Sequence, residues 1–348
     1  MHEQPSKKLI LERVSEALPL LLTFLMPLFY LTTTTEFFEH NKLMLLIVGT
    51  VLMLVVLSIR VLTGEKIKLV KSTVDLSLWA FMLVAGLATI FSVNQTASIY
   101  GGYGRWFSGL LAFIAMLGYF HFGTSSYKSK RTIKKGLYLL VGSVSIGTFI
   151  AMLSYFKIYL GKATYLRIPG FTLAGSTTTT AVLAALGVSV SLAMMAYENN
   201  KKLSIGLVVT TIINVMYVFL TGITQGWVVL VVGLVGLVMY VNLERFSSKR
   251  TEMIALAGTI IAILFATMLP TTKKLLVNNN YPKELVLPMK ESWVISSSVA
   301  RDYPILGTGL STFDLMFPRY RPMSLNNNDL WNTRFDKPYN EAFYIMGN

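Results

Sequence analysis

The chain alternates between long apolar runs and short polar segments along most of its length. Each apolar run is near 20 residues, which is the length a helix needs to cross the hydrocarbon core of a bilayer. Because backbone groups in lipid must bond to one another, such runs are expected to be helices rather than open strands. The pattern predicts nine complete spans, at about residues 18–34, 42–62, 75–93, 107–123, 136–156, 173–196, 203–221, 226–243 and 253–269.

These runs divide the chain into four parts. Residues 1–17 are polar and form a predicted cytoplasmic tail, and 18–269 form the predicted transmembrane bundle. The first run lacks a small-residue cleavage site, so it is expected to be retained as a span. Residues 270–340 form a long outer loop, and 341–348 begin a tenth span that is too short to cross a bilayer. The natural chain is therefore expected to continue past this point.

Positive charge predicts the orientation of the bundle. With the N-terminus inside, the inner segments hold 17 Lys and Arg residues and the short outer loops hold 5. Short cytoplasmic loops carry this excess in membrane proteins. The pattern therefore predicts an inner-membrane protein with a cytoplasmic N-terminus and an outer loop at 270–340.

Composition excludes other classes of protein. The chain is 53% hydrophobic and only 14% charged, with a mean hydropathy of +0.58, whereas globular domains carry about 25% charged residues. The net charge of +14 is spread between apolar runs, which argues against a nucleic-acid partner, whose binding site gathers its basic residues into a patch. The predicted spans lack a central charged residue, which disfavours a flippase or transporter.

Two short outer segments carry candidate ligand contacts. The first, Ser92–Trp106, turns through glycines and places Arg105 beside Trp106; the alternative is an interfacial arginine and tryptophan. The second places Arg167 before a Ser/Thr-rich helix start at 176–180. Such a start offers hydroxyls and free N–H groups to an anion, and the alternative is ordinary N-capping.

The long outer loop is the third candidate. It interleaves arginines with aromatic residues and contains prolines and glycines at intervals, which is typical of an ordered segment rather than a disordered one. A guanidinium group forks onto phosphate oxygens, so this composition suits a polyanionic or sugar-phosphate ligand. The alternative is a solvated basic loop. The candidate residues here are Trp293, Arg301, Arg319, Arg334, Tyr339 and Asn340.

Residues 303–313 read YPILGTGLSTF, which resembles the "hPLlGvGlgnF" signature of the O-antigen ligase and polymerase superfamily. Trp293 lies one predicted helix earlier, at the start of a helix expected over residues 293–300, as a tryptophan does in that family. The segments 92–109, 167–175 and 220–226 are similar to three further turns of the family, in the same order. The resemblance covers about residues 80–348.

The resemblance implies a GT-C-like, all-α polytopic membrane enzyme that works without a metal or other cofactor. Such enzymes pass a glycan from an undecaprenyl pyrophosphate carrier to a hydroxyl of a lipid, protein or glycan acceptor outside the cytoplasmic membrane. It assigns Arg105, Arg167, Arg319, Arg334 and Trp293 to substrate binding. It assigns Tyr339, Asn340 and Arg301 to the catalytic position.

The sequence departs from the family at three places. Tyr339-Asn340 stands where the family has His-Asn, Thr224-Gln225-Gly226 replaces Ser-Arg-Gly, and Gly175-Ser176-Thr177 replaces Asn-Pro-Asn. The unperturbed pKa of tyrosine is about 10, so its phenol is a poor base at neutral pH. These departures favour a second hypothesis, a non-catalytic membrane protein that binds lipid-linked glycan.

Overall fold

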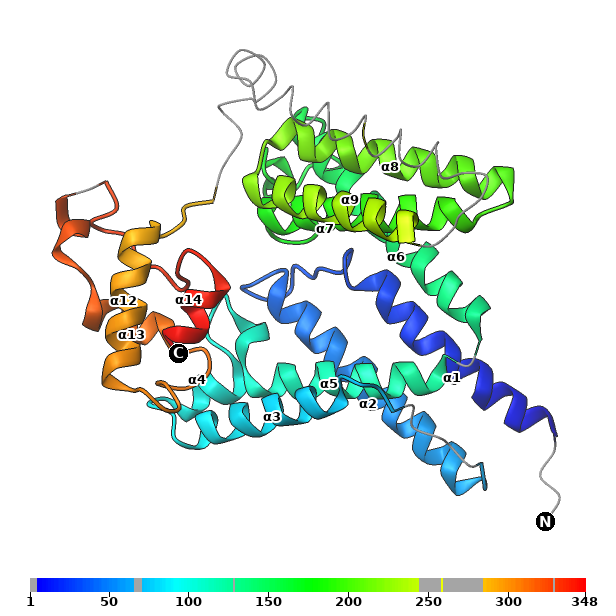
Figure 1. Cartoon of the computed structure of the whole chain (residues 1–348), viewed down its shortest axis with the longest axis horizontal. Helices are drawn as coiled ribbons and strands as arrows, with labels where there is room; N and C mark the ends of the chain where they lie inside the picture. Colours follow the sequence, from blue (N-terminus) through cyan, green and yellow to red (C-terminus); the bar gives the residue numbers. More distant parts are fainter. Residues whose placement is uncertain (1–4, 66–70, 128, 244–257, 259–283, 328) are drawn as a thin grey trace. The chain divides into compact units, whose positions relative to one another are not determined.

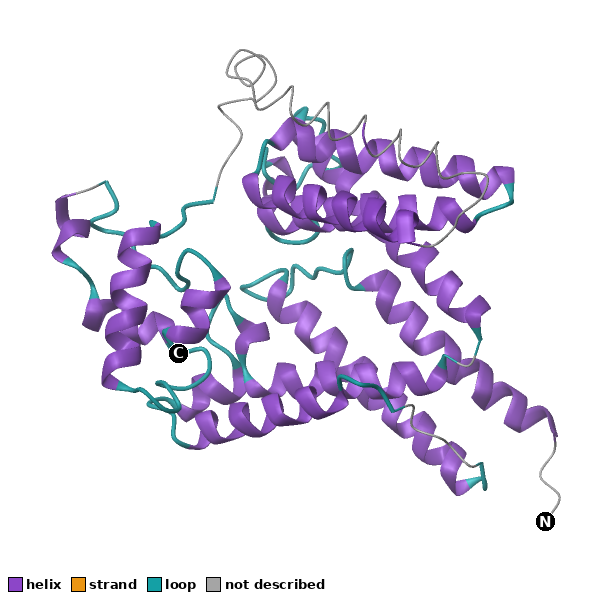
Figure 2. Ribbon diagram, viewed as in Figure 1, coloured by secondary structure: helices purple, strands orange, loops and turns teal. Residues whose placement is uncertain are grey.

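The computed structural model describes residues 5–65, 71–127, 129–243, 258, 284–327 and 329–348. The regular elements in these ranges are helices, without a strand among them (Figures 1 and 2). Within the same ranges, four helices are long and apolar enough to cross a membrane: α2 (Glu39–Leu62), α6 (Lys130–Tyr155), α7 (Thr177–Tyr197) and α8 (Lys201–Thr221). The chain is therefore an all-helical protein with the makeup of a helical membrane protein.

The chain forms two compact units. The first comprises Met1–Leu22, Leu31–Lys130 and Leu285–Asn348, and the second comprises Thr23–Tyr30 and Arg131–Glu284. The first contains α1 (Pro5–Leu25) up to Leu22, α2, α3 (Asp75–Ile90), α4 (Gln95–Tyr100), α5 (Leu110–Ser126) and the C-terminal helices. The second contains α6, α7, α8 and α9 (Thr224–Leu243).

Most of the expected spans correspond to helices whose ends differ by a few residues. The expected spans from 42–62 to 226–243 correspond, in order, to α2, α3, α5, α6, α7, α8 and α9. The helix α3 has 16 residues, or about 24 Å at 1.5 Å per residue, which is shorter than a hydrocarbon core of about 30 Å. The expected span at 253–269 lies outside the described residues apart from 258.

The first expected span, 18–34, is wrong in its bounds. The helix α1 starts at Pro5, inside the expected tail, and ends at Leu25. The helix accommodates Pro19 in its interior but ends two residues before Pro27, a second proline that lacks a backbone N–H to continue it. The following loop is held by Asn41, whose Nδ2 lies 2.9 Å from the Phe37 carbonyl and 3.1 Å from the Leu31 carbonyl. These bonds satisfy loop carbonyls that a continuous helix would otherwise have used.

In the first unit, α2 packs against α5, and polar contacts join the ends of helices that the charge pattern places inside. Ser15 Oγ lies 3.0 Å from Ser126 Oγ. The buried Arg60 donates to Ser15 Oγ at 2.9 Å and pairs with Glu65 at 2.6 Å. The segments predicted to be cytoplasmic thus gather at one end of this unit.

The second unit packs α7 against α8 and α9 through small side chains. A Cβ added to Gly226 would lie 2.9 Å from Ala181 Cβ, so the glycine lets α9 approach α7 closely. The buried Asn214 of α8 donates from Nδ2 to Ser145 Oγ of α6 at 2.9 Å. Close backbone contact and interhelical hydrogen bonds are the interactions that hold helices together in lipid.

The C-terminal segment of the first unit folds around aromatic side chains. Its helices are α12 (Met289–Asp302), α13 (Phe313–Tyr320) and α14 (Glu341–Met346). Phe313, Phe317, Ile295 and Leu325 are buried in a cluster with Tyr344. The helix expected at 293–300 lies within α12. A buried cluster of this size orders the segment, as its aromatic content predicts.

Candidate functional site

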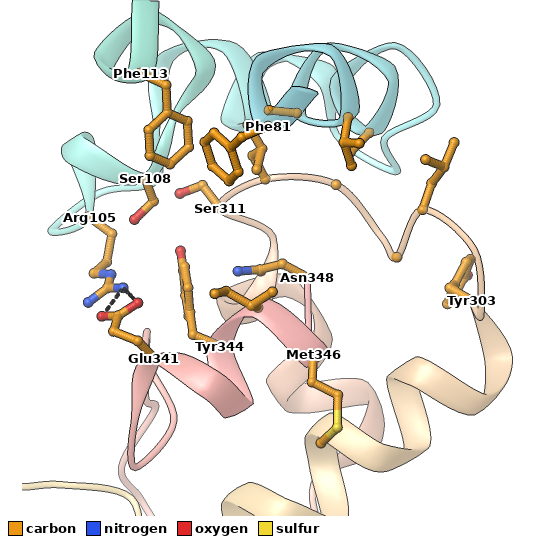
Figure 3. A pocket seen from close by; sticks show the side chains of 18 of the residues that line it. Phe81, Arg105, Ser108, Phe113, Tyr303, Ser311, Glu341, Tyr344, Met346 and Asn348 are labelled. Atoms are coloured by element: carbon orange, nitrogen blue, oxygen red, sulfur yellow. Dashed lines mark hydrogen bonds and ion pairs between the residues drawn. The ribbon is translucent and has the colours of Figure 1, made fainter. Parts of the chain in front are cut away.

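The first unit contains a cavity of about 730 Å³ where three helices end and the C-terminal segment meets them (Figure 3). It is lined by residues from the start of α2, from α3, from the turn before α5, from 303–311 and from α14. The lining combines Arg105, Glu39, Glu341 and Tyr344 with the rings of Phe81 and Phe113. The lining of this cavity therefore combines charged groups with an apolar wall.

Two segments singled out in the sequence are hydrogen-bonded to each other at this cavity. Ser92 Oγ and Val93 N both donate to the Thr308 carbonyl, at 3.1 and 3.0 Å. Ser98 Oγ donates to the Leu310 carbonyl at 2.7 Å. The Gly102 N–H donates to Ser311 Oγ at 2.6 Å. The turn at 92–106 and the segment at 303–313 therefore form one structure.

Gly309 lies at the closest approach of these two segments. Its φ of +108° is in the region that side chains disfavour, and an added Cβ would lie 2.1 Å from Ser92 Oγ. Any other residue would be strained in this conformation. Its Cβ would also require the Ser92 side chain to shift. Gly309 thus serves the contact between the two segments, whereas Gly307 lies against the backbone of Asn348.

Arg105 is the cation of the cavity. Its Nη2 lies 3.0 Å from Glu341 Oε1 and 3.3 Å from Oε2, and its guanidinium carbon lies 4.2 Å from the centre of the Tyr344 ring (Figure 3). Its buried Nε makes no hydrogen bond to any described residue. Burial acts to lower the pKa of Arg105, but Tyr344 and Glu341 outweigh it and raise that pKa. The group is a fixed positive charge with donor capacity left.

The predicted catalytic pair takes structural positions outside the cavity lining. The Tyr339 backbone N–H donates to Ser292 Oγ at 2.9 Å, and its side chain is half exposed. Asn340 Oδ1 accepts from the Phe343 N–H at 2.9 Å and caps α14. Their predicted role at the acceptor position stays a prediction.

Arg301 and Arg319 lie on the exposed surface beside Tyr303, a lining residue. Arg301 Nε is 3.5 Å from the carboxylate of Asp302, and Arg319 Nη1 donates to Tyr303 Oη at 3.2 Å. A hydrogen bond from the Tyr320 hydroxyl, helped by Arg301, lowers the pKa of Asp302. These arginines already have partners, and neither one lines the cavity.

Trp293 and Arg334 also lie outside the lining. The Trp293 ring packs edge to face on Phe343 with centroids 5.8 Å apart. Arg334 Nη2 donates to the Asp314 carbonyl at 3.0 Å. Both side chains support the C-terminal segment in this structure.

Arg167 belongs to the second unit, where it ends the short helix η2 (Thr164–Arg167). The helix start predicted to receive an anion, at 176–180, receives one from the chain itself. Ser176 Oγ donates to the Glu284 carboxylate at 2.5 Å, and Ser176 Oγ also accepts from the Thr179 N–H at 3.1 Å. An acidic group at the start of a helix is stabilised by the helix dipole.

Glu39, Glu341 and Tyr344 are lining residues that the sequence did not single out. Glu39 Oε1 accepts from the Phe107 N–H at 3.2 Å, across 68 residues of chain. The neighbouring residues His40-Asn41 spell the His-Asn pair of the resembled family, but they lie in the first turn of α2. Contacts between residues this far apart along the chain have no local signature in the sequence.

A second cavity in the first unit, of about 650 Å³, lies among α2, α3 and α5. Its wall is mainly apolar, and its ionisable groups among the described residues are Lys71, Asp75 and His121. The same described part of the chain holds no group of three His, Cys, Asp or Glu residues arranged for a metal ion. The Arg105 cavity is therefore the better candidate for an anionic ligand.

No family model, curated protein or solved structure matches this chain. Function therefore has to be argued from the cavity and from the residues that line it.

Proposed function

We propose that this chain is a membrane glycosyltransferase of the O-antigen ligase type. It would transfer a glycan from an undecaprenyl pyrophosphate carrier to an acceptor hydroxyl of a lipid, a protein or a second glycan. One observation carries the proposal. The turn at 92–106 and the segment at 303–313, which resemble two motifs of that family, are hydrogen-bonded together around a cavity that contains Arg105.

The cavity suits the two parts of such a carrier. The Arg105 guanidinium carries donors that match phosphate oxygens and would stabilise the charge on the leaving pyrophosphate. The rings of Phe81 and Phe113 offer an apolar wall to the first prenyl units. Glu341 now takes one Arg105 donor group, so the carrier has to displace it or bind beside it.

The finer architecture is part of the same proposal. We propose nine complete spans in a GT-C-like bundle in a bacterial inner membrane, with the N-terminus in the cytoplasm. The charge pattern supports this orientation. The first unit fits the proposal, because α2 and α5 have their expected outer ends at the cavity and their expected inner ends near Ser15.

A second candidate function is non-catalytic binding of lipid-linked glycan. The position of Tyr339 favours it, because this side chain lies outside the cavity lining. A binder and an enzyme would share the Arg105 contact with pyrophosphate. Only the enzyme would go on to transfer the glycan to an acceptor.

Deletion of the gene in its own strain separates these functions. A transferase predicts that the deletion strain accumulates lipid-linked glycan and lacks the transferred product at its surface. The plasmid-borne full chain restores the product, and Arg105→Gln does not. Normal product without the gene contradicts the proposal. A purified chain that binds undecaprenyl pyrophosphate in liposomes without transfer supports the binder, and movement of the glycan across the liposome membrane supports a flippase.

A further inference from the structure

The cavity contains two carboxylates, and they have different surroundings. Both oxygens of Glu341 lie close to Arg105 Nη2, at 3.0 and 3.3 Å. Both oxygens of Glu341 are therefore engaged as the counter-ion of Arg105.

Glu39 is the other carboxylate, and half of it is free. Its Oε1 accepts from the Phe107 N–H at 3.2 Å, while its Oε2 makes no hydrogen bond to any described residue. Glu39 begins α2, but Glu36 performs the capping of this helix, because the Phe38 and Glu39 N–H groups both donate to Glu36 Oε1 at 2.9 Å. The fold thus uses Glu36 at the helix end and leaves Glu39 facing the cavity that it lines.

The position of Glu39 is fixed from two sides. Phe107 lies in the short helix η1 (Trp106–Ser108), directly after Arg105. The neighbouring His40 ring packs edge to face on Trp106 with centroids 4.7 Å apart. The same turn therefore positions the carboxylate and the arginine, which is the arrangement that a proton acceptor beside an anion site requires.

The remaining polar side chains of the cavity are less suited to proton transfer. Ser311 Oγ already accepts from the Gly102 N–H at 2.6 Å. Tyr344 already packs its ring against the Arg105 guanidinium, and Ser108 carries a hydroxyl rather than a carboxylate. Among the described lining residues, Glu39 is the carboxylate that forms no direct ion pair. Arg105 and Lys337 act on it electrostatically from a longer distance.

We propose that Glu39 is the general base of the transfer, an inference that rests on the proposed function. In this step the acceptor hydroxyl oxygen forms a bond to the anomeric carbon of the carrier-linked sugar. The bond from that carbon to the pyrophosphate oxygen breaks, and undecaprenyl pyrophosphate leaves with the bonding electron pair. The hydroxyl proton passes to Glu39 Oε2, and Arg105 stabilises the leaving charge. Glu39 thereby supplies the general base, in place of Tyr339 at the catalytic position that the resemblance implies.

The test uses the full chain in liposomes, with lipid-linked glycan extracted from the deletion strain and acceptor from the same cells. Glu39→Gln keeps the shape of the side chain and removes the base, so transfer should fall about 100-fold or more. Binding of undecaprenyl pyrophosphate should stay within about twofold of wild type, since Arg105 is untouched. Glu16→Gln is the matched control, because Glu16 lies in α1 of the same unit and outside the cavity lining, and its transfer should match wild type.

Chemical rescue decides the outcome if Glu39→Gln also perturbs the fold. Glu39→Ala opens space for a small carboxylate, so added formate should restore part of the transfer. Transfer by Glu39→Gln at the wild-type rate overturns Glu39 as base and leaves the proposed function standing. Loss of transfer in Glu39→Ala without any recovery in formate also overturns it. A wild-type chain that binds the carrier and never transfers glycan overturns both.

Discussion

At the scale of single residues, the contact between the two cavity segments depends on Gly309. Replacing it with alanine places a Cβ 2.1 Å from Ser92 Oγ on a backbone with φ of +108°. We expect Gly309→Ala to destabilise the protein by about 1–3 kcal/mol, because both strain and overpacking act at this position. Thermal unfolding of the detergent-solubilised chain measures this.

The matched control is Gly86→Ala in α3 of the same unit. Its added Cβ meets nothing within 4 Å, and alanine is the better helix former by about 1 kcal/mol. We expect its midpoint to be unchanged or slightly higher. Equal midpoints for Gly309→Ala and wild type would contradict the close approach of the two segments.

At the scale of helices, Glu198 ties the end of α7 to α6. Its carboxylate pairs with Lys134 Nζ at 2.7 Å and accepts from the Tyr138 hydroxyl. The hydrogen bonds from Lys134 and Tyr138 lower the pKa of Glu198 from 4.5 to about 2. A lowered folded-state pKa contributes stability above pH 4.5, and this contribution is lost as the pH falls toward 2.

The expected result is a difference in pH dependence. The unfolding midpoint of wild type should fall more between pH 6 and pH 3 than that of Glu198→Gln, whose amide does not titrate. Other acidic groups titrate equally in both chains, so the comparison isolates Glu198. Parallel curves for the two proteins would show that this contact does not couple α6 to α7.

The helices themselves follow from apolar run length, and the places where this reasoning failed have physical causes. Hydropathy continues through Pro27, so the expected first span ran to residue 34, whereas α1 ends at Leu25, two residues before this proline. The carbonyl contacts of Asn41 with the loop depend on folding, and a single asparagine in the sequence does not reveal them. The hydrophobic pattern of a sequence therefore does not predict a helix end that depends on the contacts of one polar side chain.

The candidate site was predictable in part. Arg105 and the 303–313 segment were identified from glycine spacing and resemblance, and both line the cavity. Glu39 and Glu341 were not, because their roles arise from contacts to residues far away along the chain. Arg319 and Arg334 were identified from composition, which does not distinguish an arginine that meets a ligand from one that pairs with its own segment.

At the scale of the whole molecule, the charge pattern makes a prediction about sidedness. The chain lacks cysteine, so single introduced cysteines report without interference. In spheroplasts, a membrane-impermeant maleimide should label Asn327→Cys in the outer segment and should not label Ser129→Cys before the membrane is broken. Labelling in the reverse order would invert the topology and place the cavity on the cytoplasmic side.

The central claim is that Arg105 receives the pyrophosphate of a lipid carrier, and its ion pair with Glu341 provides a matched test. Arg105→Gln and Glu341→Gln remove the same partly exposed ion pair, which itself contributes about 0–1 kcal/mol to stability. If the pair only supports the fold, the two variants should behave alike. If Arg105 binds phosphate, they should change affinity in opposite directions.

The most direct measurement is the affinity of the full chain in nanodiscs for undecaprenyl pyrophosphate. A lost charged hydrogen bond contributes about 1.5–3 kcal/mol, so Arg105→Gln should weaken binding by at least about tenfold. Glu341→Gln should tighten binding, because it frees the guanidinium from its internal carboxylate. Wild-type affinity in Arg105→Gln, or an equal loss in both variants, would contradict the account.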